Sequence, residues 1–182
     1  MHEIWIKNYE KGQNSAVSFF DLSAAFDTLC KDIFCSKLKL YGFNQKSVDW
    51  FHSYLSDRHQ IVKIGACLSE KIKLNVGSPQ GAILSPTIFI ILIADIGLWS
   101  NSTIFGYADD TTATQTNEDI DVLVVECETE AKKIIDYMSV NRLAANDDKT
   151  HIMIIRRKKS ENKISVKIGN KEITETSNEK LF

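Results

Sequence analysis

The stretch Phe105-Gly106-Tyr107-Ala108-Asp109-Asp110-Thr111-Thr112 is the part of the sequence that decides the fold. The residues before and after its centre favour strands, so it predicts two short strands joined by a tight Ala-Asp-Asp turn. Such a hairpin holds two neighbouring carboxylates at its tip, where a hard divalent cation would relieve their mutual repulsion. The alternative is an ordinary acidic turn, since Asp is common in turns.

A further carboxylate follows a short apolar run. Residues 16–20 are apolar enough for a buried strand, and Asp21 comes directly after them. A carboxylate at the end of a buried strand needs a partner or a metal ion, although Asp21 could instead cap the following turn. If this strand neighbours the hairpin, Asp21, Asp109 and Asp110 converge. Three carboxylates on rigid strands can hold two Mg²⁺ ions roughly 3.5–4 Å apart, an arrangement suited to in-line phosphoryl displacement.

The remaining sequence predicts helices and further strands around this pair of features. Residues 1–15 are polar and show no clear period. Helices are expected over 32–41 with Asp32 as a cap, over 44–55 with Asn44 as a cap, over 82–99 as a buried apolar helix, and over 118–142. The aromatic residues of the first two helices are expected in the core, with a nucleic-acid stacking platform as the alternative. The last helix carries one apolar stripe, formed by Ile120, Leu123, Cys127, Ala131, Ile134 and Met138. Strands are expected over 60–65, 71–76 and 151–155, with a last hairpin over 163–173. This order predicts an α+β fold, a mainly antiparallel sheet with helices packed on one face.

Two further stretches have more than one interpretation. Residues 77–86 contain two glycines and two prolines, and they form a shaped loop that leads into the apolar helix. Gln80 in this loop offers both a donor and an acceptor, but a plain strand-to-helix connection is the alternative. The basic residues 156–159 could contact phosphate, or they could form a solvated turn.

Composition excludes several classes of protein. The chain has 182 residues with 43% hydrophobic and 25% charged residues and only two prolines, which is typical of one globular domain and not of a disordered chain. Its formal net charge of −2 says little about partners, because an acidic site can mask a basic surface. The apolar run over 82–99 contains Pro86 and Asp95, which argues against a membrane span. The four scattered cysteines favour buried thiols in an intracellular protein, with nucleus and cytoplasm both open.

Four ordered motifs resemble those of reverse transcriptases of the non-LTR retrotransposon type. They are Phe19-Phe20-Asp21-Leu22-Ser23-Ala24-Ala25-Phe26-Asp27, Gly77-Ser78-Pro79-Gln80-Gly81-Ala82-Ile83-Leu84-Ser85-Pro86, Tyr107-Ala108-Asp109-Asp110 and Asn146-Asp147-Asp148-Lys149-Thr150. The resemblance covers about residues 16–182. It implies a polymerase palm with partial fingers, preceded by a polar segment over 1–15 and lacking the thumb, with 180–182 similar to the start of a truncated primer-grip motif.

The resemblance also implies a metal site. It makes Asp21, Asp109 and Asp110 the ligands of two Mg²⁺ ions, with Mn²⁺ as a possible substitute and the carbonyl of Leu22 as a possible further ligand. The residues around these carboxylates favour a cation that prefers oxygen ligands, but they do not identify that cation.

Five other residues receive substrate-binding roles from the resemblance. Phe26 would screen the incoming sugar against a 2′-hydroxyl, and Gln80 and Gly81 would lie against the template and the incoming nucleotide. Tyr107 would lie near the primer end, and Lys149 near the triphosphate. Each role has a plainer alternative: core packing for Phe26 and Tyr107, and a surface charge for Lys149.

The function implied is RNA-directed DNA polymerase activity, the addition of dNTPs to a primer 3′-OH on an RNA template. One rival is a catalytically silent retroelement remnant that binds nucleic acid or a protein partner. The other is an RNA-dependent RNA polymerase, which Phe26 disfavours because a small or polar residue there would admit a 2′-hydroxyl. The sequence indicates no membrane partner and leaves the oligomeric state open.

Overall fold

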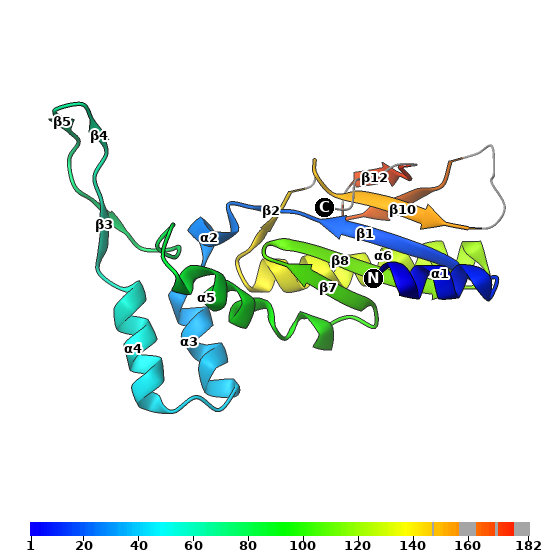
Figure 1. The fold of residues 1–182 in the computed structure, drawn as a ribbon, viewed down its shortest axis with the longest axis horizontal. Coiled ribbons are helices and arrows are strands. Elements are labelled where there is room, and N and C mark those ends of the chain that lie inside the picture. The colour runs from blue at the N-terminus through cyan, green and yellow to red at the C-terminus, as the bar shows by residue number, and fades with distance from the viewer. Residues whose placement is uncertain (147, 157–162, 170, 177–182) are drawn as a thin grey trace. The chain divides into compact units, whose positions relative to one another are not determined.

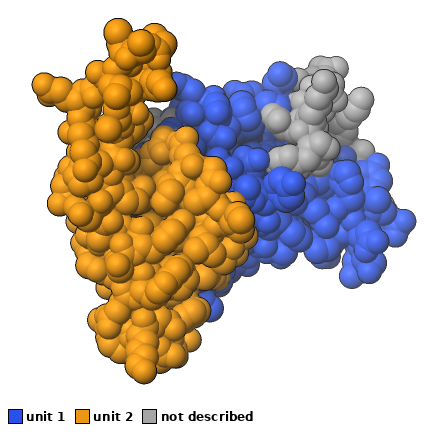
Figure 2. All heavy atoms as spheres, turned by 60° about the vertical axis from the view of Figure 1, so that its left-hand side comes forward, with its two compact units in different colours: residues 1–23, 95–140, 144–182 blue, residues 24–94, 141–143 orange. Residues whose placement is uncertain are grey.

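The computed structural model describes residues 1–146, 148–156, 163–169 and 171–176. The chain divides into two compact units, which differ in colour in Figure 2. Residues 1–23, 95–140 and 144–182 form one unit, here called the sheet unit, and residues 24–94 and 141–143 form the other, here called the helical unit.

The sheet unit is built on a four-stranded antiparallel sheet (Figure 1). The strand β1 (Asn14–Phe20) lies between β8 (Asp110–Asn117) and β10 (His151–Ile155), and β7 (Thr103–Tyr107) pairs with the other edge of β8. The apolar run, the acidic hairpin and the strand over 151–155 were all predicted, and the structure confirms them. The mainly antiparallel sheet of the predicted α+β fold is therefore confirmed.

The long helix α6 (Ile120–Val140) covers one face of this sheet. Its buried residues recur at helical spacing and include the predicted stripe of Leu123, Cys127, Ala131, Ile134 and Met138. The Cys127 thiol lies 3.3 Å from the Ser18 hydroxyl of β1, and burial raises the pKa of this thiol to about 11. The face that carries Ser18 is therefore packed against α6 and closed to solvent.

A short helix that the sequence did not predict, α1 (His2–Glu10), lies at the opposite face. Trp5, its one buried residue, donates from Nε1 to the hydroxyl of Thr114 at 3.3 Å. Thr114 pairs with Val17, and successive strand residues face opposite sides, so this contact lies on the face away from Ser18. The expectation that helices pack on one face thus holds for α6 but not for α1, whose polar sequence contains one buried residue. Asn8 of α1 also donates to the Thr116 hydroxyl at 3.0 Å.

Two smaller strand pairs complete the sheet unit. The predicted last hairpin is present as β11 (Ser165–Ile168) and β12 (Lys171–Thr174), and it packs against α6 and β10. The two-residue strands β2 (Leu22–Ser23) and β9 (Ala144–Ala145) pair with each other. Of the basic residues 156–159, Arg156 forms a 2.6 Å ion pair with Glu175, so its side chain is not simply solvated. The other three lie outside the described residues.

The helical unit contains the helical hairpin of α3 (Lys31–Leu40) and α4 (Gln45–Leu55), preceded by the short α2 (Ala25–Thr28). Asn44 caps α4 as predicted, because its side chain accepts a 2.9 Å hydrogen bond from the Ser47 N–H. Helix α3 begins at Lys31 after Cys30, so Asp32 lies in its first turn and is not its cap. Trp50 is 53% exposed and stacks on Tyr54, so the expectation that it belongs to the core is wrong.

An extended ribbon follows α4. The strand β3 (Arg58–Gln60) pairs with β6 (Ile72–Leu74), and β4 (Lys63–Ile64) pairs with β5 (Cys67–Leu68). The predicted strands over 60–65 and 71–76 are therefore real but shorter and interrupted. Cys67 is exposed in this ribbon, whereas the other three cysteines are buried and all four are free.

The apolar helix α5 (Leu84–Ile93) is shorter than the expected helix over 82–99. The chain continues as a 3₁₀ turn over Ile96–Leu98 after Asp95. Ile83 is 93% and Leu98 is 88% exposed, so the run is not buried throughout. No helix among the described residues has the length and apolarity needed to cross a membrane.

The loop that begins at Gly77 is held tightly against α2. The Gly77 N–H donates to the Leu29 carbonyl at 2.7 Å, and the Ser78 N–H donates to the Phe26 carbonyl at 2.7 Å. Gly77 has a φ of +88°, and a Cβ added there would lie 2.8 Å from the Asp27 carbonyl oxygen. Only glycine fits this close approach of two backbone segments.

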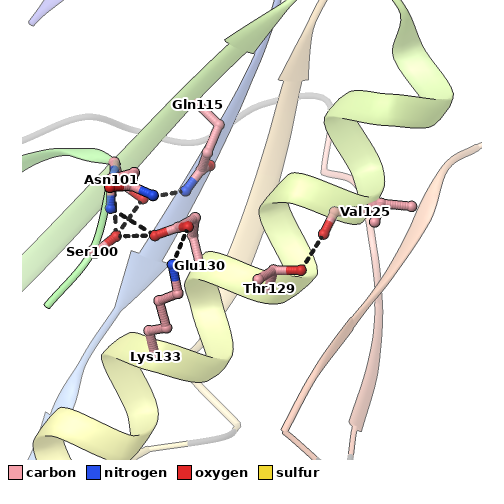
Figure 3. A network of polar contacts seen from close by, with 8 residues as sticks. Ser100, Asn101, Gln115, Val125, Thr129, Glu130 and Lys133 are labelled. Carbon is pink, nitrogen blue, oxygen red and sulfur yellow. Dashed lines mark hydrogen bonds and ion pairs between the residues drawn. The ribbon is translucent and has the colours of Figure 1, made fainter.

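A buried polar network fixes the chain just before β7 (Figure 3). The Glu130 carboxylate of α6 accepts 2.7 Å hydrogen bonds from the Ser100 hydroxyl and the Asn101 N–H, and it pairs with Lys133 at 2.7 Å. Burial acts to raise the pKa of Glu130, but the hydrogen bonds from Lys133, Ser100 and Asn101 outweigh it and lower the pKa below its ordinary value. The network therefore ties the start of the acidic hairpin to α6 through an ionised carboxylate.

We expect Glu130→Gln to destabilise the protein by about 1–3 kcal/mol at pH 7, because it removes a buried charge that three donors share. A lowered pKa means that the contribution is fully present above the ordinary carboxyl pKa and is lost as the pH falls through the lowered value. Urea unfolding at pH 7 and at pH 3 measures this. The gap between wild type and variant should shrink at pH 3, whereas the exposed Glu126→Gln should cost little at either pH. An equal gap at both pH values would contradict the assignment.

We expect Gly77→Ala to destabilise the protein more than Gly81→Ala does. Both glycines have positive φ, at +88° and +78°, which costs an alanine about 1–2 kcal/mol. Only at Gly77 does the added Cβ also meet the Asp27 backbone, because nothing lies within 4 Å of a Cβ at Gly81. Urea unfolding of the two variants compares them directly. Equal free energies of unfolding would show that the loop moves away without cost.

Candidate active site

The acidic hairpin holds two of the predicted carboxylates. Tyr107 at the end of β7 pairs with Asp110 at the start of β8, so Ala108 and Asp109 form a two-residue turn. Ala108 has a φ of +53°, which is uncommon for a residue with a side chain. The hairpin register therefore fixes the positions of both carboxylates on a rigid element.

The third carboxylate, Asp21, lies directly after β1. The last register pair of β1 and β8 is Phe20 with Thr111, so Asp21 and Asp110 are the next residues on the two strands. Burial raises the pKa of Asp110, and the negative charges of Asp109 and Asp21 raise it further. Because β1 pairs with a strand of the acidic hairpin, the structure brings together the three carboxylates that the sequence predicted.

A cation also belongs to this cluster. The ammonium of Lys149 lies 3.3 Å from a carboxylate oxygen of Asp21, and its charge acts to lower the pKa of Asp110. The Asn146 N–H donates to the Asp21 backbone carbonyl at 2.8 Å, and Leu22 pairs with Ala145. The segment that carries Lys149 is therefore tied to Asp21 through the backbone as well as through the ion pair.

The donor set fits a hard divalent cation, since carboxylate oxygens are the ligands that Mg²⁺ prefers. Burial raises the pKa of Asp110, and the charges of Asp109 and Asp21 add to this effect. Within the described part of the chain, no group of three or more His, Cys, Asp or Glu side chains is already arranged to hold a metal ion. The carboxylates are neighbours in the strand register, but their side chains are not arranged around a common cation.

The two other predicted residues of the sheet unit flank the carboxylates. Leu22 is buried in the short strand pair with β9, next to Asp21 in sequence. Tyr107 is 73% exposed and pairs with Asp110 across the hairpin, so core packing does not account for it.

The remaining predicted residues, Phe26, Gln80 and Gly81, belong to the helical unit. The Phe26 ring is half-buried and packs against Phe89 at a centroid distance of 5.3 Å. Gln80 is exposed, and its amide donates to the Asp27 carboxylate at 2.7 Å. The structure brings Phe26 and the loop of Gln80 together through the hydrogen bonds of Ser78, but it groups only the residues of the sheet unit with the carboxylates.

Two residues of this region have contacts that the sequence did not reveal. Asn146 holds the backbone of Asp21, and Asp27 holds the side chain of Gln80. Both residues lie inside motifs quoted above, and that was the one signal available. Their contacts join segments far apart in the sequence, so no local pattern predicts them.

The chain is similar to known proteins in sequence and in fold. The family model described as "Reverse transcriptase (RNA-dependent DNA polymerase)" matches residues 2–175. The Pol polyprotein of the type-1 retrotransposable element R2 of Popillia japonica is 27% identical over 86 residues, which are 47% of this chain and 14% of that protein.

Solved structures of telomerase share the fold. A Candida albicans telomerase in complex with a fragment of telomeric RNA matches with a TM-score of 0.61 and 15% identity, over 96% of this chain and 32% of its own. A truncated Candida tropicalis telomerase matches with a TM-score of 0.60 and 17% identity, over 94% of this chain and 37% of its own. This likeness confirms the predicted palm-like sheet. Because the family model covers nearly the whole sequence, the chain belongs to the reverse transcriptase (RNA-dependent DNA polymerase) family.

Proposed function

We propose that this chain is the palm, with part of the fingers, of an RNA-directed DNA polymerase that adds dNTPs to a primer 3′-OH. The observation that supports this most is the meeting of Asp21, Asp109 and Asp110 at neighbouring strand ends of an antiparallel sheet. Family membership gives the class of reaction. The matched relative is far longer than this chain, so the whole enzyme's template and primer remain part of the proposal.

The three carboxylates would hold the metal ions of the reaction, with the Leu22 carbonyl as a further ligand. Two Mg²⁺ ions, or Mn²⁺, would supply Lewis acidity to an in-line displacement at the α-phosphorus of the nucleotide. The chain's own contribution is position: the pairing of β1 with β8 and the β7–β8 turn fix where each carboxylate stands. Rigid strands suit this role, because a misplaced ligand costs much of the rate.

The substrate-binding residues take roles that their surroundings support. Phe26 would screen the sugar, and its contact with Phe89 holds the ring in one place. Gln80 and Gly81 would lie against the template and the incoming nucleotide, with Gln80 oriented by Asp27. The exposed ring of Tyr107 would lie near the primer end. Lys149 would approach the triphosphate from its place beside Asp21.

We expect Asp109→Asn to lower the rate of Mg²⁺-dependent primer extension on an RNA template at least about a hundredfold, because it removes a carboxylate that would hold the metal ions. Asp136→Asn on the exposed surface of α6 is the matched control and should extend primers as wild type does. Circular dichroism should show that both variants keep the fold. Extension by Asp109→Asn at the wild-type rate would remove this residue from the site.

We expect Phe26→Ala to reduce the preference for deoxynucleotides over ribonucleotides about tenfold or more, because a smaller side chain leaves room for a 2′-hydroxyl. Single-nucleotide incorporation with dNTP and NTP pairs measures the ratio. Phe51→Ala removes another half-buried ring of the helical unit and should leave the ratio unchanged. A wild-type ratio in Phe26→Ala would restrict Phe26 to a packing role.

A further inference from the structure

The ammonium of Lys149 lies beside the carboxylates that the proposed function assigns to metal ions. Its Nζ is 3.3 Å from Asp21 Oδ2, and its charge also stabilises the ionised form of Asp110. Without this cation, the crowded carboxylates would have less relief from their mutual repulsion. Lys149 therefore does the electrostatic work of a counter-ion in the resting protein.

The backbone N–H of Lys149 is held by a hydrogen bond, whereas its side chain is largely exposed. The Asn146 N–H binds the Asp21 carbonyl at 2.8 Å, and the Lys149 N–H binds the Asn146 carbonyl at 3.1 Å. The Lys149 side chain is 66% exposed, whereas that of Asp21 is only 23% exposed. Rotation of the side chain alone can therefore carry the ammonium away from Asp21 while the segment stays in place.

We propose that Lys149 is a displaceable counter-ion of this site: it occupies Asp21 in the resting protein, and a divalent cation must displace it to bind. This inference rests on the proposed function. The lysine end of this ion pair is largely exposed, which weakens the pair, so a divalent cation can displace the ammonium. The released ammonium then becomes available to the triphosphate of an incoming nucleotide. Metal binding and the release of Lys149 are then one coupled event.

Titration of the protein with Mn²⁺ at pH 8, followed by the loss of the free-ion paramagnetic resonance signal, tests the competition. Lys149→Met keeps the length and apolar body of the side chain but removes the charge, so we expect Mn²⁺ to bind about two- to fivefold more tightly. Lys171→Met is the matched control, because Lys171 pairs with Asp148 at 3.0 Å and not with Asp21. It should bind Mn²⁺ as wild type does.

The outcomes separate the two proposals. Equal or weaker Mn²⁺ binding by Lys149→Met, at a site that Asp110→Asn abolishes, would overturn the counter-ion role and leave the metal site standing. If the wild type binds no Mn²⁺, or binds it only at a site that Asp110→Asn leaves intact, both the metal site and the counter-ion role would be overturned. If Mn²⁺ binds tightly in competition with Lys149 but the protein extends no primer, the polymerase activity alone would be contradicted.

A second measurement follows the lysine itself. Brief acetylation with a water-soluble reagent, read by peptide mass spectrometry, reports how accessible each ammonium is. Saturating Mn²⁺ should raise the labelling of Lys149 severalfold and leave that of Lys171 unchanged. Unchanged or reduced labelling of Lys149 would show that the ammonium stays with Asp21, which would overturn displacement.

Discussion

The antiparallel pairing of β1 with β8 is the constraint on which the site depends, because it holds three mutually repelling carboxylates near one another. Asp21 and Asp110 follow one another across neighbouring strands, and Asp109 is the next residue in the turn. Burial raises the pKa of Asp110, and the negative charges of Asp109 and Asp21 raise it further, so this arrangement disfavours the ionised form of Asp110. Pairing between β1 and β8 from Asn14–Asn117 to Phe20–Thr111 holds the carboxylates in spite of that repulsion.

The two faces of the sheet carry different groups. The face of Ser18 is closed by α6, and the carboxylate of Glu130 in that helix holds the residues before β7. Strand alternation puts Asp110 on the same face as Thr112 and Thr114, away from α6. The contacts with α6 thus lie on one face of the sheet, and Asp110 lies on the other face, which also carries the contact of Trp5 with Thr114.

Local patterns predicted the elements of the sheet and part of the site. The acidic hairpin, β1, the stripe of α6 and the cap at Asn44 follow from spacing within a few residues, and the structure contains them all. Helix α1 was missed because Trp5 is its one buried residue, and α5 was made too long because apolarity alone does not show that the helix ends at Ile93. The ion pair of Lys149 with Asp21 joins distant segments, so no pattern in the sequence could predict it.

The division of the chain into units has a consequence for the order of folding. The chain leaves the sheet unit after Ser23 and returns to it at Asp95, so β1 and β8 can pair only when the whole intervening segment forms a closed loop. Loop closure is an entropic barrier that slows folding when contacts are far apart in sequence. Residues 24–94 are continuous and form their own helical hairpin, so they can order first and lower the entropy that remains to be lost. We therefore expect residues 24–94 to order before β1 and β8 pair.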